Sequence, residues 1–276
     1  MEKINWLFLF LFAFAIAACD DEDDVAPDAD APEIAITSPA VNTSFLVIDE
    51  IELRANVTDN REVEQVRIYL SGPDGDRRQV DEVNIDFVND SRNENLKVTF
   101  YMAEGSAAGI YTMIVEAQDE QQNTSESAVN INVQAPDLEK VAFNTALTKN
   151  TFFRKRVINN GASLTEGEFG TSVFHIMDRG HDGYVENNEF DKFTVDFDLE
   201  TSSDWYYYDE FDGLSLGTLN ALLRKVKFFD DWDLDNNNLL NEAELTGGIF
   251  GRWDDNEDGV LSRNEYESKM HTYFIP

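Results

Sequence analysis

The sequence predicts a multidomain fold, an all-β sandwich followed by an all-α domain. Segments that alternate apolar and polar residues run through residues 33–134, and turn residues such as Gly, Pro and Asp bound them. From residue 138 onward the apolar residues recur instead at helical spacings of three and four. A short Gln-Ala-Pro-Asp linker at residues 134–137 separates the two patterns, and a chain of 276 residues is long enough for two domains.

The N-terminus has the features of a cleaved targeting segment. An apolar run over residues 6–18 follows a single lysine and is shorter than the roughly 20 residues of a bilayer-spanning helix. The run ends in Ile-Ala-Ala immediately before Cys19, which resembles the lipobox of bacterial lipoproteins. The resemblance implies a signal peptide over residues 1–18 and a lipid bilayer as partner through acylated Cys19. An ordinary signal peptide with a chance cysteine is the alternative. Since Cys19 is the only cysteine, the chain has no internal disulfide.

Five consecutive acidic residues, at positions 20–24, follow Cys19. This tract resembles the surface-export signal of lipoproteins in the Bacteroidetes group, which implies an outer-membrane, lipid-anchored protein that faces the cell exterior. A charged spacer that keeps the protein off an anionic membrane is the alternative. Residues 19–32 are acidic and contain Pro27 and Pro32, so we expect them to form a disordered tether.

The first domain is predicted over residues 33–134. Regularly spaced, half-buried strands are typical of β-sandwiches. The expected strands cover residues 34–36, 51–57, 66–70, 96–100, 111–117 and 129–133. Residues 55–60 and 109–119 resemble immunoglobulin-like modules of bacterial surface proteins, which often lack the cysteine pair, as this chain does. The resemblance implies an immunoglobulin-like β-sandwich in which Tyr111 is a core or corner residue.

Three acidic residues are candidates for a calcium site at one end of this sandwich. Asp59, Glu62 and Asp119 follow strands or open turns, and cadherin-like sandwiches gather calcium ligands at such an end. Asp and Asn are also ordinary turn residues, so a purely structural role is the favoured interpretation.

Two acidic loops of twelve residues, 233–244 and 254–265, carry the most specific pattern in the chain. Oxygen-bearing side chains fall at positions 1, 3, 5, 9 and 12, with a backbone carbonyl at position 7, which is the spacing of an EF-hand Ca²⁺ loop. The candidate ligands of the first loop are Asp233, Asp235, Asn237, the Leu239 carbonyl, Asn241 and Glu244. Those of the second loop are Asp254, Asn256, Asp258, the Val260 carbonyl, Ser262 and Glu265. The sequence therefore predicts Ca²⁺ as a cofactor of a helical paired EF-hand domain over residues 138–276.

Positions 6 and 8 of these loops support the same interpretation. Position 6 needs a positive φ angle, which Gly259 adopts freely and Asn238 at some cost. Position 8 is apolar in both loops, and such residues meet across a short β-bridge in paired EF-hands. We therefore expect Leu240 to pair with Leu261. Two solvated acidic turns without metal are the alternative.

A third loop, residues 178–189, has the same register with fewer ligands. Gly180 offers no side-chain ligand at position 3, so water would fill that place. The candidate ligands are Asp178, Asp182, the Tyr184 carbonyl, Glu186 and Glu189. Residues 157–168 look like a degenerate fourth loop that keeps Leu164 at position 8 and lacks an acidic first ligand. We expect this fourth loop to serve in pairing without a metal.

Residues 214–229 show the clearest helical periodicity and are predicted to lead into the loop at residues 233–244. Ser215 or Thr218 is the expected N-cap. Ser215 also lies in a Gly-x-Ser-x-Gly pattern at residues 213–217, but acidic residues precede it where a hydrolase has a buried strand. The three histidines show no base-and-orienter arrangement. We therefore expect no enzymatic activity and keep a hydrolase using Ser215 as the least favoured alternative.

Residues 204–211 are dense in aromatic and acidic residues. Trp205, Tyr206, Tyr207 and Tyr208 could stack on the sugar rings of a glycan, with carboxylates as hydrogen-bond acceptors. Packing of these rings between the helical pairs is the favoured interpretation. An adhesion or glycan-binding surface module is the alternative function that this segment supports.

The formal net charge of −34 excludes nucleic acid as a partner, because its phosphates would be repelled. Bound Ca²⁺ would offset part of this charge, and the remainder makes the metal-free protein self-repelling. The predicted function is that of a calcium-binding, lipid-anchored cell-surface protein in which Ca²⁺ locks paired EF-hands. A surface protein or a glycan is the candidate ligand of such a module.

Overall fold

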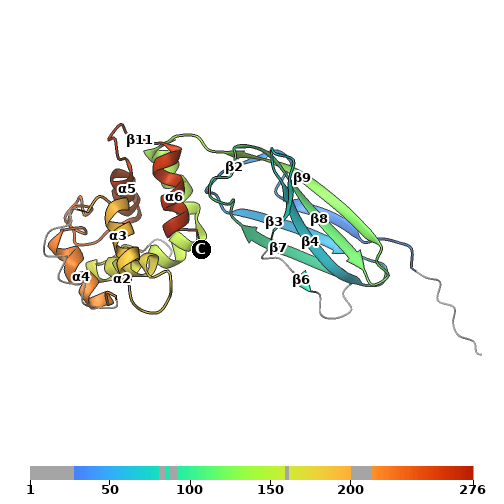
Figure 1. The fold of residues 1–276 in the computed structure, drawn as a ribbon, viewed down its shortest axis with the longest axis horizontal. Coiled ribbons are helices and arrows are strands. Elements are labelled where there is room, and N and C mark those ends of the chain that lie inside the picture. The colour runs from blue at the N-terminus through green and yellow to red at the C-terminus, as the bar shows by residue number, and fades with distance from the viewer. Residues whose placement is uncertain (1–27, 81–84, 87–91, 159–161, 200–212, 276) are drawn as a thin grey trace, which may run out of the picture.

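A computed structural model describes residues 28–80, 85–86, 92–158, 162–199 and 213–275. Within these residues a β-sandwich is followed by a helical domain, and the chain crosses from one to the other near residue 135 (Figure 1). No helix in this part of the chain is long and apolar enough to span a membrane. The predicted signal peptide, Cys19 and the aromatic segment at residues 204–211 lie outside the described residues.

Two sheets form the sandwich. The smaller sheet is antiparallel, with strand order β1 (Glu33–Ser38), β3 (Ile51–Thr58) and β7 (Asn93–Phe100). The larger sheet has the order β2 (Thr43–Leu46), β9 (Thr124–Gln134), β8 (Gly109–Asp119), β4 (Val63–Ser71) and β5 (Arg77–Gln79), with β6 (Ile85–Asp86) also paired to β4. β2 runs parallel to β9, whereas the other pairs in this sheet are antiparallel.

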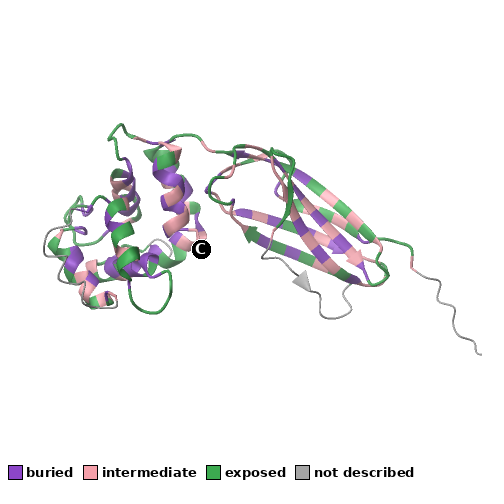
Figure 2. Cartoon of the chain, in the orientation of Figure 1, coloured by how far each residue is buried: buried purple, intermediate pink, exposed green. Residues whose placement is uncertain are grey.

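Alternation along the strands builds the core of the sandwich (Figure 2). One face of β3 buries Ile51, Leu53, Ala55 and Val57. One face of β8 buries Tyr111, Met113, Val115 and Ala117. All six strands expected from the alternation are confirmed, as β1, β3, β4, β7, β8 and β9. β2 and the fully exposed β5 were missed, because an edge strand that buries no face carries no period-2 apolar signal.

The segment that leads into β1 is attached to the sandwich. The Asn60 side-chain amide donates to the carboxylates of Asp28, at 3.0 Å, and Asp30, at 3.1 Å. The Asn123 side-chain amide donates to the Asp28 carbonyl at 3.1 Å. The disordered tether predicted over residues 19–32 therefore does not include residues 28–32. Composition could not reveal this, because the anchoring amides belong to two distant turns.

The described part of the second domain is helical. It contains α1 (Lys140–Lys149), the π-helix η1 (Phe153–Val157), α2 (Glu166–Met177), α3 (Asn187–Asp196), α4 (Leu216–Lys225), α5 (Glu242–Trp253) and α6 (Arg263–Tyr273). Buried aromatic rings fill its centre: the Trp253 ring lies 5.6 Å from Phe143 and 5.9 Å from Phe197, measured between ring centroids. Ser215 caps α4 as expected. The helix predicted over residues 214–229 ends at Lys225, and Lys227 has a φ angle of +54° that an α-helix cannot include.

The helical domain is an internal repeat. The helices α1, α2 and α3 begin at residues 140, 166 and 187, and α4, α5 and α6 begin at 216, 242 and 263, so each counterpart follows after 76 residues. α1 packs on α5 and α2 packs on α4, which are equivalent contacts when the halves are exchanged. The two halves are therefore related by a pseudo-two-fold axis.

The β-bridges obey the same symmetry. Leu164 pairs with Leu240, and each of these residues is the counterpart of the other. The remaining two bridges, Leu138–Leu261 and Val185–Leu214, exchange places when 76 residues are added or subtracted. Each helix N-terminus thus directly follows a bridged residue and the capping residue.

The predicted pairing of Leu240 with Leu261 is wrong. The amide of Leu240 donates to the carbonyl of Leu164 and the reverse bond is also made, both at 2.8 Å, while Leu261 pairs with Leu138 in β10 (Leu138–Glu139) and β11 (Val260–Leu261). The physical reason is α5, which ends one loop and begins the next. Its 12 residues are about 18 Å long, so they hold the two loops apart at opposite ends.

Polar contacts join α6 to the loop between β7 and β8. The Arg263 guanidinium donates to the Ser106 carbonyl at 2.6 Å and to a carboxylate oxygen of Glu267 at 2.7 Å. The backbone amide of Gly105 donates to the same Glu267 oxygen at 3.0 Å. Burial raises the pKa of Glu267, but the bonds from Arg263 and Gly105 outweigh it and hold the net pKa below its usual value. Glu267 is therefore a charged link between the domains.

The Glu267→Gln variant should unfold with a free energy about 1–3 kcal/mol below that of the wild type at pH 7, the usual worth of hydrogen bonds to a buried charge. A depressed carboxyl pKa stabilises the fold above the unfolded-state value of about 4.5. The stabilisation is lost as the pH falls through the lower folded-state pKa, so the difference should shrink below about pH 4.5. Urea unfolding across this pH range measures both effects.

The matched control is Glu52→Gln, which removes an ion pair between Glu52 and Lys97 on the solvent-facing side of the small sheet. Such exposed pairs contribute less than about 1 kcal/mol. Equal destabilisation by the two substitutions would contradict a special role for Glu267 at the domain junction.

Candidate metal centre

The three predicted metal loops, residues 178–189, 233–244 and 254–265, share one backbone conformation. Positions 4 and 6 have positive φ angles in each of them: His181 and Gly183, Asn236 and Asn238, and Glu257 and Gly259. Position 6 was expected from the pattern, whereas position 4 was missed because its residue type differs among the loops. In all three, position 9 is the N-cap of the following helix and position 12 forms the capping box with it.

The loop at residues 233–244 gathers its carboxylates most closely. Oxygens of Asp233, Asp235 and Glu244 all lie within 4.8 Å of one another. Asp233 accepts hydrogen bonds from the amides of Asn237, at 3.1 Å, and Asn238, at 2.8 Å. Glu244 accepts from the amides at positions 2 and 9 of the loop, at 3.0 Å each. Asp233 and Glu244 are each only 7% exposed, so their charges face the loop interior.

Three like charges at this distance require a counter-charge. At a separation near 4 Å and an effective dielectric constant of 20, each pair of unit charges repels by about 4 kcal/mol. A divalent cation that prefers oxygen ligands would remove this repulsion. Asn237 and Asn241 add uncharged oxygens at positions 5 and 9, although both now accept hydrogen bonds from loop amides.

The loop at residues 254–265 repeats this wiring. Asp254 accepts from the amides of Asp258, at 3.1 Å, and Gly259, at 2.9 Å. Glu265 accepts from Asp255, at 3.1 Å, and from the cap residue Ser262, at 2.7 Å. Burial raises the pKa of Glu265, but these bonds hold the net pKa below its usual value. The carboxylate is therefore charged at neutral pH, as a metal ligand must be.

The loop at residues 178–189 keeps the two end positions. Asp178 is buried and accepts from the amides of Asp182, at 3.2 Å, and Gly183, at 3.1 Å. Glu189 accepts from the amides of Arg179, at 2.9 Å, and Glu186, at 3.0 Å. With Gly180 at position 3, this loop offers one ligand fewer than the other two.

The degenerate loop at residues 157–168 pairs through Leu164, as expected. Val157, at its first position, is the counterpart of Asp233 and is buried among apolar side chains. Glu168 accepts from the amide of Thr165 at 2.9 Å and serves as a helix cap. This loop therefore keeps the fold of its counterpart without the charges that a cation needs.

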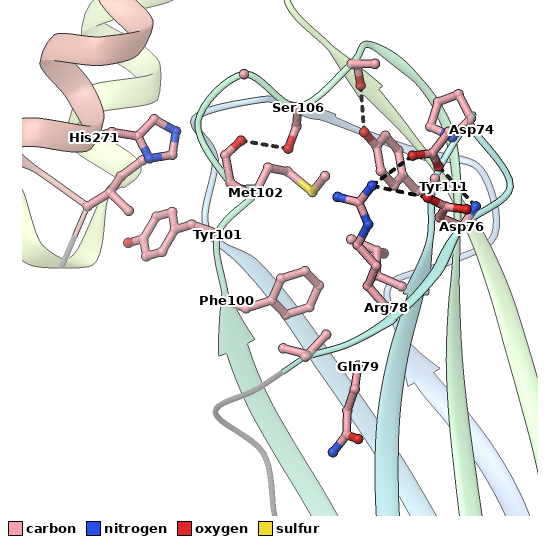
Figure 3. A pocket seen from close by; sticks show the side chains of 18 of the residues that line it. Asp74, Asp76, Arg78, Gln79, Phe100, Tyr101, Met102, Ser106, Tyr111 and His271 are labelled. Atoms are coloured by element: carbon pink, nitrogen blue, oxygen red, sulfur yellow. Dashed lines mark hydrogen bonds and ion pairs between the residues drawn. The ribbon is translucent and has the colours of Figure 1, made fainter.

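A separate cleft of about 810 Å³ lies between the sandwich and the helical domain (Figure 3). Tyr101 and Tyr111 line it, but their hydroxyls donate outward to Glu50 at 2.9 Å and to the Ala107 carbonyl at 2.8 Å. The bond to Ala107 confirms Tyr111 as a corner residue. Burial lowers the pKa of His271 at the cleft, so its imidazole is neutral at neutral pH. The cleft is distant in sequence from every predicted metal ligand, and it was not foreseen because its wall comes from both domains.

The remaining predicted site residues are not brought into a site by the described structure. Ser215 accepts a hydrogen bond from the Thr218 amide at 3.3 Å as the cap of α4. Cys19, the lipidation candidate, lies outside the described residues. So do the aromatic candidates Trp205, Tyr206, Tyr207 and Tyr208.

Residues 32–113 match a protein family described as Bacterial Ig domain. The N-terminal domain is accordingly an immunoglobulin-like β-sandwich, and a helical region follows it. No curated protein matches the chain.

Several solved structures resemble part of the chain at low identity. One is that of the fibronectin(III)-like modules of CbhA from Clostridium thermocellum, with 16% identity over 38% of this chain and 47% of that one, so about half of that protein is spanned, at a TM-score of 0.27. Another is a Niemann-Pick type C2 protein from Japanese carpenter ant, with 16% identity over 37% of this chain and 89% of that one, at a TM-score of 0.28. A superoxide reductase (neelaredoxin) from Ignicoccus hospitalis shows 12% identity over 38% and 81%, at a TM-score of 0.28.

The Gly259→Ala variant should lose about 1–2 kcal/mol of unfolding free energy, because its φ angle of +83° crowds a Cβ atom against its own backbone. Gly167→Ala is the matched control. A Cβ atom meets no neighbour within 4 Å at either position, but Gly167 lies in α2 with ordinary helical geometry. The control should gain about 0.5–1 kcal/mol in thermal or urea unfolding. Equal effects of the two substitutions would contradict the loop conformation.

Proposed function

We propose that the helical domain is a calcium-binding EF-hand domain on a lipid-anchored cell-surface protein, and that Ca²⁺ stabilises its structure. The supporting observation is the clustering of Asp233, Asp235 and Glu244 within 4.8 Å in a loop whose backbone conformation recurs at residues 178–189 and 254–265. The anchor rests on the sequence before and after Cys19.

The arrangement of the loops favours a structural role for the cation. Glu244 and Glu265 occupy the last ligand position and also cap α5 and α6. A cation that draws in either carboxylate therefore acts directly on a helix N-terminus. Because α5 lies between two metal loops, the ions would fix both of its ends at once. Opening of one EF-hand relative to another, which a calcium sensor needs, is opposed by this shared helix.

Calcium should raise the melting temperature of the chain that lacks residues 1–19. If a site binds with a Kd of about 10 μM, then 1 mM Ca²⁺ stabilises the fold by about 2.7 kcal/mol per site. Isothermal titration calorimetry should give two or three ions per chain, and chelation should lower the melting temperature. Absence of binding together with an unchanged melting temperature would refute the proposal.

Substitutions can assign the ions to loops. Glu244→Gln and Glu265→Gln should each remove one ion from the stoichiometry, because each deletes the carboxylate expected to be bidentate. The matched controls are Glu242→Gln and Glu257→Gln, which remove the same charge from the same loops at positions that are not ligand positions. If the controls lose as much calcium as the ligand variants, binding is a diffuse effect of net charge.

A surface adhesion or glycan-binding module is the second candidate function. The immunoglobulin-like sandwich supports it, and the cleft lined by Tyr101 and Tyr111 gives such a module a recess for a ligand. The aromatic segment at residues 204–211 offers a further surface in this proposal.

Replacement of Trp205, Tyr206, Tyr207 and Tyr208 by Ala separates recognition from packing. If these rings recognise a glycan, the variant should keep the wild-type melting temperature and lose binding in a glycan-array assay. A variant that melts well below the wild type would instead assign the rings to packing. Ser215→Ala tests the hydrolase alternative, which is eliminated if any esterase activity of the wild type persists.

A further inference from the structure

Three separate segments bring carboxylates together at the end of the sandwich where the chain enters β1 (Figure 1). Asp28 precedes β1, Asp59 lies in the turn between β3 and β4, and Asp119 ends β8. One oxygen from each side chain lies within 4.8 Å of the other two. This cluster is in a different domain from the loops discussed above, so it stands independently of their function.

The cluster is withdrawn from water. Asp119 is 0% exposed, and the Asp28 side chain is 3% exposed. Asp119 is held in place by the Asn123 backbone and side-chain amides, both at 2.7 Å. Burial of a carboxylate is costly unless hydrogen bonds and an opposite charge accompany it.

Two oxygens of the cluster lack the partners that burial demands. Asp28 Oδ1 accepts from Asn60 at 3.0 Å, and Asp59 Oδ1 accepts from the amides of Arg61, at 2.8 Å, and Glu62, at 3.0 Å. The Oδ2 atoms of Asp28 and Asp59 are inaccessible to solvent and accept no hydrogen bond from any described residue. Buried polar atoms are rarely left in this state, so each one needs an explanation.

Arg61 accounts for part of the charge only. Its Nε atom lies 3.4 Å from Asp28 Oδ2, an ion pair that balances one of three negative charges. About two charges remain, which is the valence of a calcium ion. Three ligands from separate turns form an irregular site, and Ca²⁺ accepts such sites more readily than Mg²⁺, which demands near-octahedral geometry.

We propose that Asp28, Asp59 and Asp119 bind a Ca²⁺ ion at the entry end of the sandwich. The ion would fasten the segment before β1 to the turns that follow β3 and β8. In a lipid-anchored chain this fixes the point where a flexible tether ends and the rigid sandwich begins. Glu62, the third candidate from the sequence, contributes its backbone amide to Asp59, and Asp28 takes the place of its carboxylate.

Hydrogen–deuterium exchange on the full chain, with and without 1 mM CaCl₂, tests this site separately from the helical loops. Calcium should slow exchange in peptides that cover residues 28–32, 59–62 and 119–123. The protection should persist when Glu189, Glu244 and Glu265 are all replaced by Gln, because these residues belong to the other domain. The Asp119→Asn variant should need at least about tenfold more calcium for the same protection.

Glu120→Gln is the matched control, since it removes the neighbouring, exposed charge from the same turn and should leave the calcium response unchanged. Asp28→Asn provides a second variant that does not alter a strand, in case Asp119→Asn fails to fold. The proposal is overturned if calcium protects none of the three peptides in the wild type. It is equally overturned if their protection depends on Arg61, tested as Arg61→Ala, and is indifferent to calcium, because the arginine is then the sole counter-ion.

Discussion

The bridge between Leu164 and Leu240 is the contact around which the helical domain is arranged. Its two hydrogen bonds lie on the pseudo-two-fold axis, and the flanking bridges at Leu138 and Val185 are copies of each other under that symmetry. Each bridge fixes where a helix begins, because the residue after it is the N-cap. The position of α5 between two acidic loops follows from this arrangement, and so does the separation of those loops.

The same geometry concentrates negative charge at the helix starts. In each acidic loop, one carboxylate at position 12 caps a helix and faces a second carboxylate at position 1 across the loop. The N-terminus of a helix favours an anion, but its partial positive charge is about half a unit, which cannot balance a cluster of three. The two halves of the repeat resolve this differently. The half that begins at α4 keeps both sets of ligands, whereas Val157 removes the charge from the first loop of the other half.

The domain junction depends on a different balance. Glu267 and Arg263 are shared between α6 and the loop at residues 103–107, and the cleft beside them is walled by both domains. The opposite end of the sandwich gathers Asp28, Asp59 and Asp119. Acidic side chains thus occur at the end that receives the N-terminal segment, and polar contacts hold the end that meets the helices. The sandwich acts as a spacer whose two ends are each held by charged groups.

Short-range patterns in the sequence determined the two fold classes, the boundary between them and the register of every metal loop. Period-2 alternation marks the strands that bury one face, and acidic residues at fixed loop positions mark the places where Ca²⁺ ligands converge. Tertiary structure decided which bridged residues meet, since the 21-residue step between loops conceals a 76-residue repeat whose partners come from opposite halves. It also decided that Asp28 joins Asp59 and Asp119, because residues distant in the chain become neighbours only when the sheets pack and bring their turns together.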